Sequence, residues 1–151
     1  MDKKKPILVS ACLLGEPCRY DGASKPCSAV LALKERYDLI PICPEVMGGL
    51  PTPRIPSEVM GEHVIMHDGR DVTENYRRGA EEALRIAVEN GCTLAILKEK
   101  SPSCGSSGIY DGSFTKTLIP GDGITAALLK SHGIRVIGES AIENSILEKN
   151  Q

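Results

Sequence analysis

The chain has 151 residues, of which 41% are hydrophobic and 25% are charged, and this balance is typical of one globular domain with a single core. The formal net charge of −2 argues against a stable complex with nucleic acid. No apolar stretch is long enough to cross a membrane, and residues 1–6 lack the apolar segment of a signal peptide. We therefore expect residues 1–151 to form one cytoplasmic domain.

Strand and helix patterns alternate along the chain, which favours an α/β fold. The expected elements, in chain order, are a strand over Ile7–Ala11, a helix over Ser28–Tyr37, a strand over Asp38–Ile42, a short edge strand over Val64–Met66, a helix from Asp71 to Asn90, a strand over Thr93–Lys98, a helix over Gly123–His132, a strand over Ile134–Gly138 and a helix over Ala141–Glu148. We predict a three-layer domain, with a mainly parallel sheet of about four strands and helices on both faces.

Three segments carry further expectations. Asp71 is expected to cap the central helix, with Glu74 completing a capping box. The apolar stripe of that helix is expected to run over Val72, Tyr76, Ala80, Ala83, Leu84, Ala87 and Val88. Five of the ten prolines cluster around and after Ile42 and predict a long irregular loop, which favours a functional role. A small hairpin is expected around Tyr110 in the glycine-rich stretch.

Three cysteines follow three of the expected strands: Cys12, Cys43 and Cys104. Because the carboxyl ends of parallel strands meet at one sheet edge, where open α/β sheets bind ligands, we expect these cysteines to converge. In a reducing compartment, cysteines serve more often as metal ligands or catalysts than as disulfides, and the six present contain no C-x-x-C pair of a zinc ribbon. Three thiolates can hold an iron–sulfur cluster and leave one iron free to bind a substrate as a Lewis acid. The alternative for each is a small buried core residue.

The remaining cysteines and the loop charges are less specific. Cys92 precedes a strand and is expected in the core, and Cys27 is not expected to be a ligand. Cys18 lies in the first loop on the ligand side, where it lines the pocket, accepts sulfur or has a structural role. Charged residues in the two loops are candidates for binding ring oxygens or a phosphate, although loop charges are usually solvated: Arg19, Asp21, Lys25 and Arg54. The histidines His63, His67 and His132 are expected at the surface or at edges.

Several motifs together resemble the thiouracil desulfidase family over residues 7 to about 140. They are SACLLG at residues 10–15, CRYDG at 18–22, CPE at 43–45, GGLPTPR at 48–54, GxDVT at 69–73, KEKSPSCG at 98–105 and GITAALL at 123–129. The motifs are long and occur in order, so the resemblance is specific.

The resemblance implies a [4Fe–4S] cluster held by Cys12, Cys43 and Cys104. The fourth iron would take up the sulfur of a small thiolated pyrimidine, as the base, nucleoside or nucleotide. A hydrolytic, non-redox reaction would replace C=S with C=O and release sulfide. By motif, the site would also contain Glu45 and a serine, for which Ser101 is the better candidate and Ser103 the alternative.

Glu45 and Ser101 also have roles that follow from their chemistry. Glu45 is placed to act as the base for an attacking water, or it accepts backbone hydrogen bonds in its loop. Ser101 orients water or the ring carbonyl, or it is an ordinary turn serine. Two other functions fit the cysteines: a sulfur-transfer or redox enzyme that uses thiolates without iron, and a non-catalytic iron–sulfur sensor module. The sequence carries no prediction of the oligomeric state.

Overall fold

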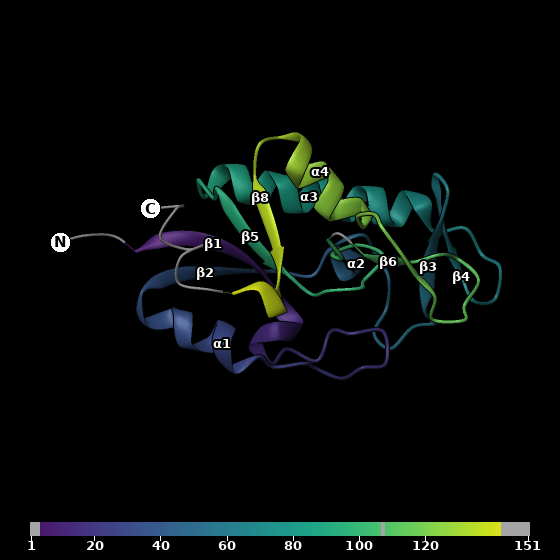
Figure 1. Ribbon diagram of the computed structural model, residues 1–151, viewed down its shortest axis with the longest axis horizontal. Coiled ribbons are helices and arrows are strands. Elements are labelled where there is room, and N and C mark those ends of the chain that lie inside the picture. The colour runs from purple at the N-terminus through teal and green to yellow at the C-terminus, as the bar shows by residue number, and fades with distance from the viewer. Residues whose placement is uncertain (1–3, 107, 143–151) are drawn as a thin grey trace.

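The computed structural model describes residues 4–106 and 108–142, and its centre is a sheet of four parallel strands (Figure 1). The strands stand in the order β2-β1-β5-β8, and every neighbouring pair is parallel. Their bounds are Lys5–Ser10 for β1, Tyr37–Ile42 for β2, Leu94–Leu97 for β5 and Arg135–Gly138 for β8. The predicted parallel sheet of about four strands is confirmed.

Helices cover both faces of the sheet, as expected (Figure 1). They are α1 (Ser28–Leu31) on one face, and α3 (Thr73–Glu89) and α4 (Ile124–Ser131) on the other. The side chains of β1 alternate between the two layers: Ile7 and Val9 pack on the α1 side, and Leu8 packs on the α3 and α4 side. A strand that is buried on both faces must be apolar throughout, and this explains the unbroken apolar run in β1.

The helix α1 ends earlier than expected, at Leu31 and not at Tyr37. The α-helix gives way to a 3₁₀-helix over Ala32–Glu35, and Tyr37 already belongs to β2. At the other end of the chain, most of the helix expected over 141–148 lies outside the described residues, which end in a 3₁₀-helix over Glu139–Ala141. Within residues 4–106 and 108–142, no helix is both long and apolar enough to cross a membrane.

Two antiparallel hairpins lie at the end of the molecule opposite the start of β1 (Figure 1). They are formed by β3 (Ser57–Met60) with β4 (His63–Met66), and by β6 (Ile109–Tyr110) with β7 (Leu118–Ile119). The expected hairpin around Tyr110 is therefore confirmed. The proline-rich segment is more regular than expected, because it contains the short helix α2 (Pro44–Met47) and β3. The expected edge strand is β4, which pairs with β3 and not with the central sheet.

The stripe of α3 that faces the core is made largely of small residues. A Cβ on Gly79 would lie 1.8 Å from the carbonyl oxygen of Pro44, so only glycine permits α2 to approach α3 this closely. The helix α2, which carries Glu45, is thereby held directly against α3. Contrary to expectation, Val88 is 65% exposed, so the buried stripe ends one residue before it.

The start of α3 also differs from the expected capping box. Val72 and not Asp71 is the N-cap residue, because the backbone at Asp71 still pairs with β4. The Asp71 carboxylate instead accepts hydrogen bonds from the backbone N–H and the hydroxyl of Thr73, at 2.9 and 2.5 Å. Glu74 forms an ion pair with Arg77, which lies three residues later in the same helix, and it makes no capping hydrogen bond at the start of the helix.

Candidate functional site

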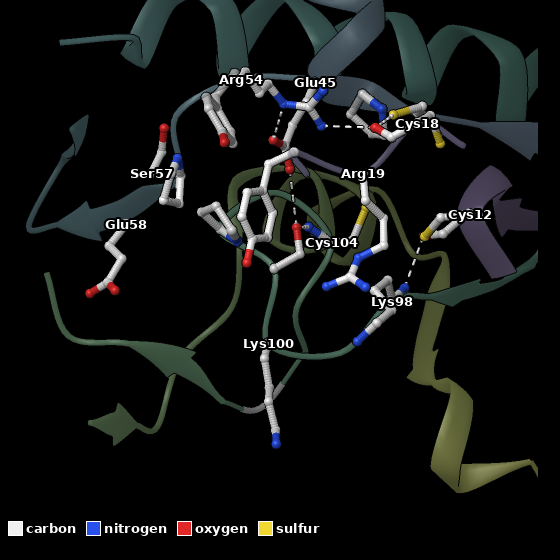
Figure 2. A pocket seen from close by; sticks show the side chains of 18 of the residues that line it. Cys12, Cys18, Arg19, Glu45, Arg54, Ser57, Glu58, Lys98, Lys100 and Cys104 are labelled. Atoms are coloured by element: carbon white, nitrogen blue, oxygen red, sulfur yellow. Dashed lines mark hydrogen bonds and ion pairs between the residues drawn. The ribbon is translucent and has the colours of Figure 1, made fainter. Parts of the chain in front are cut away.

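The three predicted cysteines line one pocket at the carboxyl ends of β1, β2 and β5 (Figure 2). Cys12 lies in a 3₁₀-helix, Ala11–Leu14, that directly follows β1. Cys43 follows β2 and is the N-cap residue of α2. Cys104 lies in the loop after β5. The parallel register of β1 and β2 places these segments at the same sheet edge, around a cavity of about 460 Å³.

Cys43 and Cys104 are protonated thiols at neutral pH in this arrangement, because their pKa values are raised. Burial raises the pKa of Cys104 to about 12, and the nearby Glu45 and Cys43 add to the rise. The pKa of Cys43 is also raised, chiefly by a hydrogen bond with Cys18. A metal that bound here would displace these protons, because thiolate is the form that coordinates metals.

Cys18 is a fourth cysteine of the same pocket. Its side chain hydrogen-bonds with those of Cys12 and Cys43, and its carbonyl oxygen accepts a bond from the Cys43 thiol at 3.7 Å. The hydrogen bond with Cys12 is the main reason that the pKa of Cys18 is raised to about 11. Cys27 and Cys92 do not line the pocket, and Cys92 packs in the core on the α3 side.

The donor set fits an iron–sulfur cluster. Among the described residues, no group of three or more His, Cys, Asp or Glu side chains is placed to share a single metal ion. A cubane cluster binds each thiolate on a different iron, so its ligands suit three separate segments such as those of Cys12, Cys43 and Cys104. The cavity also carries five cationic side chains against three carboxylates, and this excess balances the negative charge that thiolates introduce. The cations are Arg19, Arg54, Lys98, Lys100 and Lys116.

Glu45 is held in the pocket by a buried ion pair (Figure 2). The Arg54 Nε donates to Glu45 Oε1 at 3.0 Å, and the two side chains are 3% and 15% exposed. The same guanidinium donates to the carbonyl oxygens of Pro51 and Cys18, both at 3.0 Å. Arg54 therefore joins α2, the proline-rich loop and the Cys18 loop. Loop charges are usually solvated, but the Arg54 side chain is buried, and its N–H groups donate to protein oxygens.

Ser101 links Glu45 to the loop that carries Cys104. Its hydroxyl donates to Glu45 Oε2 at 3.4 Å and accepts the backbone N–H groups of Ser103 and Cys104, each at 3.1 Å. Ser103 itself is fully buried, bonds with the Thr125 hydroxyl at 2.7 Å and does not line the cavity. Of the two candidate serines, the structure places Ser101 beside Glu45.

Tyr76 adds a third contact to the Glu45 carboxylate. The sequence identifies Tyr76 only as part of an apolar stripe, but its hydroxyl contacts both Glu45 and Ser57 at the cavity. Burial, together with the charge of Glu45, raises the pKa of Tyr76 well above its usual value. The phenol is therefore neutral and can donate a hydrogen bond to the carboxylate.

Other residues of the cavity were not identified by the sequence. Glu58 and Phe114 line it, as does His67, which is exposed, in agreement with the expected place at the surface or at an edge. The His67 and Phe114 rings are stacked, with centroids 4.5 Å apart and planes 12° apart. Among the loop charges, Arg19 and Arg54 line the cavity, whereas the other two do not. These residues come from segments that lie far apart in the sequence, and no local pattern joins them.

Comparison with known proteins agrees with the geometry of the site. The family model for 2-thiouracil desulfurase matches residues 7–141. The chain is 43% identical over 151 residues to "Uncharacterized protein YbbK" of Bacillus subtilis (strain 168), across 93% of this chain and 99% of that protein. A solved structure, "[4Fe-4S]-dependent thiouracil desulfidase TudS", is 49% identical and superposes with a TM-score of 0.89, covering 98% of this chain and 99% of that one. With its fold, its pocket cysteines and a family match over nearly its whole length, the chain belongs to the 2-thiouracil desulfurase family.

Proposed function

We propose that the chain holds a [4Fe–4S] cluster through Cys12, Cys43 and Cys104 and removes the sulfur of a small thiolated pyrimidine. The observation that carries this proposal is the meeting of the three cysteines with Glu45 and Ser101 in one cavity. The similarity to a solved protein named as a [4Fe–4S]-dependent thiouracil desulfidase supports it. The substrate is a thiolated base, nucleoside or nucleotide.

The reaction is a hydrolysis that needs no electron donor. Water adds its oxygen to the ring carbon, the carbon–sulfur bond breaks, and the sulfur leaves as hydrogen sulfide. When bound, the cluster supplies a Lewis-acidic iron that polarises the thiocarbonyl.

Glu45 is the base that takes a proton from the attacking water. Arg54 holds one oxygen of its carboxylate, so that the other, Oε2, faces Ser101. Ser101 orients this oxygen through its hydroxyl, and it is itself fixed by two backbone N–H groups of the Cys104 loop. Tyr76 completes the set by contacting the same carboxylate from α3. A base held on three sides keeps its orientation while water attacks.

We also propose that the whole chain acts as one domain in the cytoplasm. Six free cysteines, four of them at one pocket, suit a reducing compartment.

An anaerobic assay tests the proposed activity. Protein reconstituted with iron and sulfide is desalted and mixed with 2-thiouracil or 4-thiouracil, and free sulfide is measured alongside the loss of thiocarbonyl absorbance. We expect release by the wild type and loss of release, with iron retained, in Glu45→Gln. The matched control is Glu81→Gln, which changes an exposed carboxylate on α3 and should behave like the wild type.

Two outcomes would contradict the proposal. Iron without sulfide release from either base would favour a sensor module. Sulfide release by the iron-free chain would favour a thiol enzyme.

A further inference from the structure

The loop between β6 and β7, residues 111–117, forms part of the pocket and has an unusual backbone. Three non-glycine residues of the described chain adopt left-handed φ angles: Lys100 at 68°, Phe114 at 59° and Lys116 at 61°. All three line the cavity. Such conformations are unfavourable for residues with a Cβ, and they persist where surrounding contacts hold them, often at functional sites.

Glu58 supplies contacts that hold this loop. It is a carboxylate in β3 that is only 7% exposed, and its Oε1 accepts the backbone N–H groups of Gly112 at 2.9 Å and Phe114 at 3.2 Å. The loop is also pressed onto β3, because a Cβ on Gly112 would lie 2.4 Å from Met60 Cγ. Since Glu58 accepts the backbone N–H of Phe114 itself, it fixes the position of Phe114 directly.

Phe114 and His67 together form an aromatic wall of the cavity. Phe114 is the one phenylalanine of the chain, and this residue is half-buried, whereas His67 is exposed. The pair joins the β6–β7 loop to the segment after β4, since His67 follows that strand. Because the two rings are stacked on one another, the surface that the pair offers is the outer face of a ring, and such a face stacks well on a planar heteroaromatic ring.

We propose that Phe114 is the wall on which the substrate ring stacks, and that Glu58 is a positioning residue that holds this wall in place. The inference rests on the proposed function, because it specifies how the desulfidase pocket selects a planar ring. Both hydrogen bonds to Glu58 Oε1 come from the loop backbone, and this geometry assigns Glu58 to the loop and not to the reacting atoms.

The first test compares side chains at position 114 in reconstituted protein. Phe114→Leu should raise the KM for the thiouracil and weaken the binding of uracil by about 5- to 150-fold, which is the range that the loss of one base–aromatic stack covers. Its kcat should change by no more than about twofold, because a contact that stabilises the bound substrate and the transition state equally affects KM and not kcat. Phe114→Tyr retains the ring and should behave like the wild type. Leu118→Ala, at an exposed residue of the same hairpin, is the matched control.

The second test separates positioning from general stability. Glu58→Ala should raise KM about as much as Phe114→Leu, whereas Glu58→Gln keeps an acceptor oxygen and should restore most of the loss. The double variant Glu58→Ala, Phe114→Leu should be no worse than either single change, because both act through the same wall. Glu62→Ala, at an exposed carboxylate in the β3–β4 turn, is the control. Circular dichroism shows whether each variant is folded. If Glu58→Ala is unfolded, the KM values and uracil affinities of Glu58→Gln and of the Phe114 variants decide the test.

Uracil binding, measured by calorimetry on the reconstituted protein, keeps this inference separate from the proposed activity. If the wild type releases no sulfide, the activity fails, but weaker uracil binding by Phe114→Leu still supports the wall. The inference is overturned if Phe114→Leu binds uracil like the wild type. It is also overturned if the Glu58→Ala and Phe114→Leu losses add, or if Glu58→Ala lowers kcat with KM unchanged.

Discussion

Replacing Arg54 with alanine should leave the Glu45 carboxylate without its ion-pair partner in a largely buried position. Removing one partner of a buried pair costs about 3–5 kcal/mol of folding free energy, because the remaining charge stays desolvated. Glu45 keeps its contacts with Ser101 and Tyr76 and is 15% exposed, so we expect about 3 kcal/mol, the lower end of this range. For a chain of this length, such a loss lowers the melting temperature by about 6–12 °C.

The matched control is Arg70→Ala, which removes the partner of an exposed carboxylate. The Arg70 and Asp68 side chains are 65% and 36% exposed, although their 2.7 Å separation is shorter than that of the buried pair. Exposed pairs contribute about 0–1 kcal/mol, so this variant should melt within about 4 °C of the wild type. Thermal unfolding of the cluster-free chain under reducing conditions, followed by circular dichroism, measures both variants.

Arg54→Ala should also slow sulfide release by about 100-fold after reconstitution, because the Glu45 carboxylate loses one of the three contacts that orient it toward the attacking water. Equal melting temperatures for Arg54→Ala and Arg70→Ala would refute the reasoning that burial makes the Arg54 pair important. Unchanged turnover in Arg54→Ala would refute the claim that the ion pair orients Glu45.

Three further predictions concern the contacts around the site. Ser101→Ala should bind as much iron as the wild type, and its rate of sulfide release should fall by about 100-fold. Equal rates in the iron-loaded variant and the wild type would exclude Ser101 from the mechanism. Ser103→Ala leaves the Thr125 hydroxyl without its partner and should cost about 1–3 kcal/mol in a urea titration, with sulfide release unchanged; a loss of turnover as large as that of Ser101→Ala would contradict the assignment. Gly79→Ala places a Cβ against the Pro44 carbonyl and should destabilise the chain by about 1–3 kcal/mol, and a variant as stable as the wild type would show that α2 can move away from α3.

The features that could be predicted from the sequence follow from strong local patterns and from one topological rule. The apolar run Ile7-Leu8-Val9 predicts a strand, which the structure confirms, and the structure shows that this strand is buried on both faces. Once such strands are parallel, their carboxyl ends meet, and this places Cys12, Cys43 and Cys104 at one edge without any knowledge of side-chain contacts.

The features that could not be predicted depend on partners that are distant in the sequence. Arg54 is buried because it meets Glu45 and the carbonyl of Cys18, which lies 36 residues away. Strand β3 begins with Ser57 and Glu58, two buried polar residues, so no alternation of apolar and polar residues marks it as a strand.

The same limit applies to the wall of the cavity. The stacking of His67 on Phe114 arises only when the two hairpins come together.

Counting iron and acid-labile sulfide per chain, in the wild type and in single cysteine variants, tests the central claim most directly. After anaerobic reconstitution, the wild type should hold about four irons. Cys12→Ser, Cys43→Ser and Cys104→Ser should each lose most of this iron, whereas the core variant Cys92→Ser should retain it. A wild type without iron, or a full cluster in any of the three pocket variants, would contradict the account.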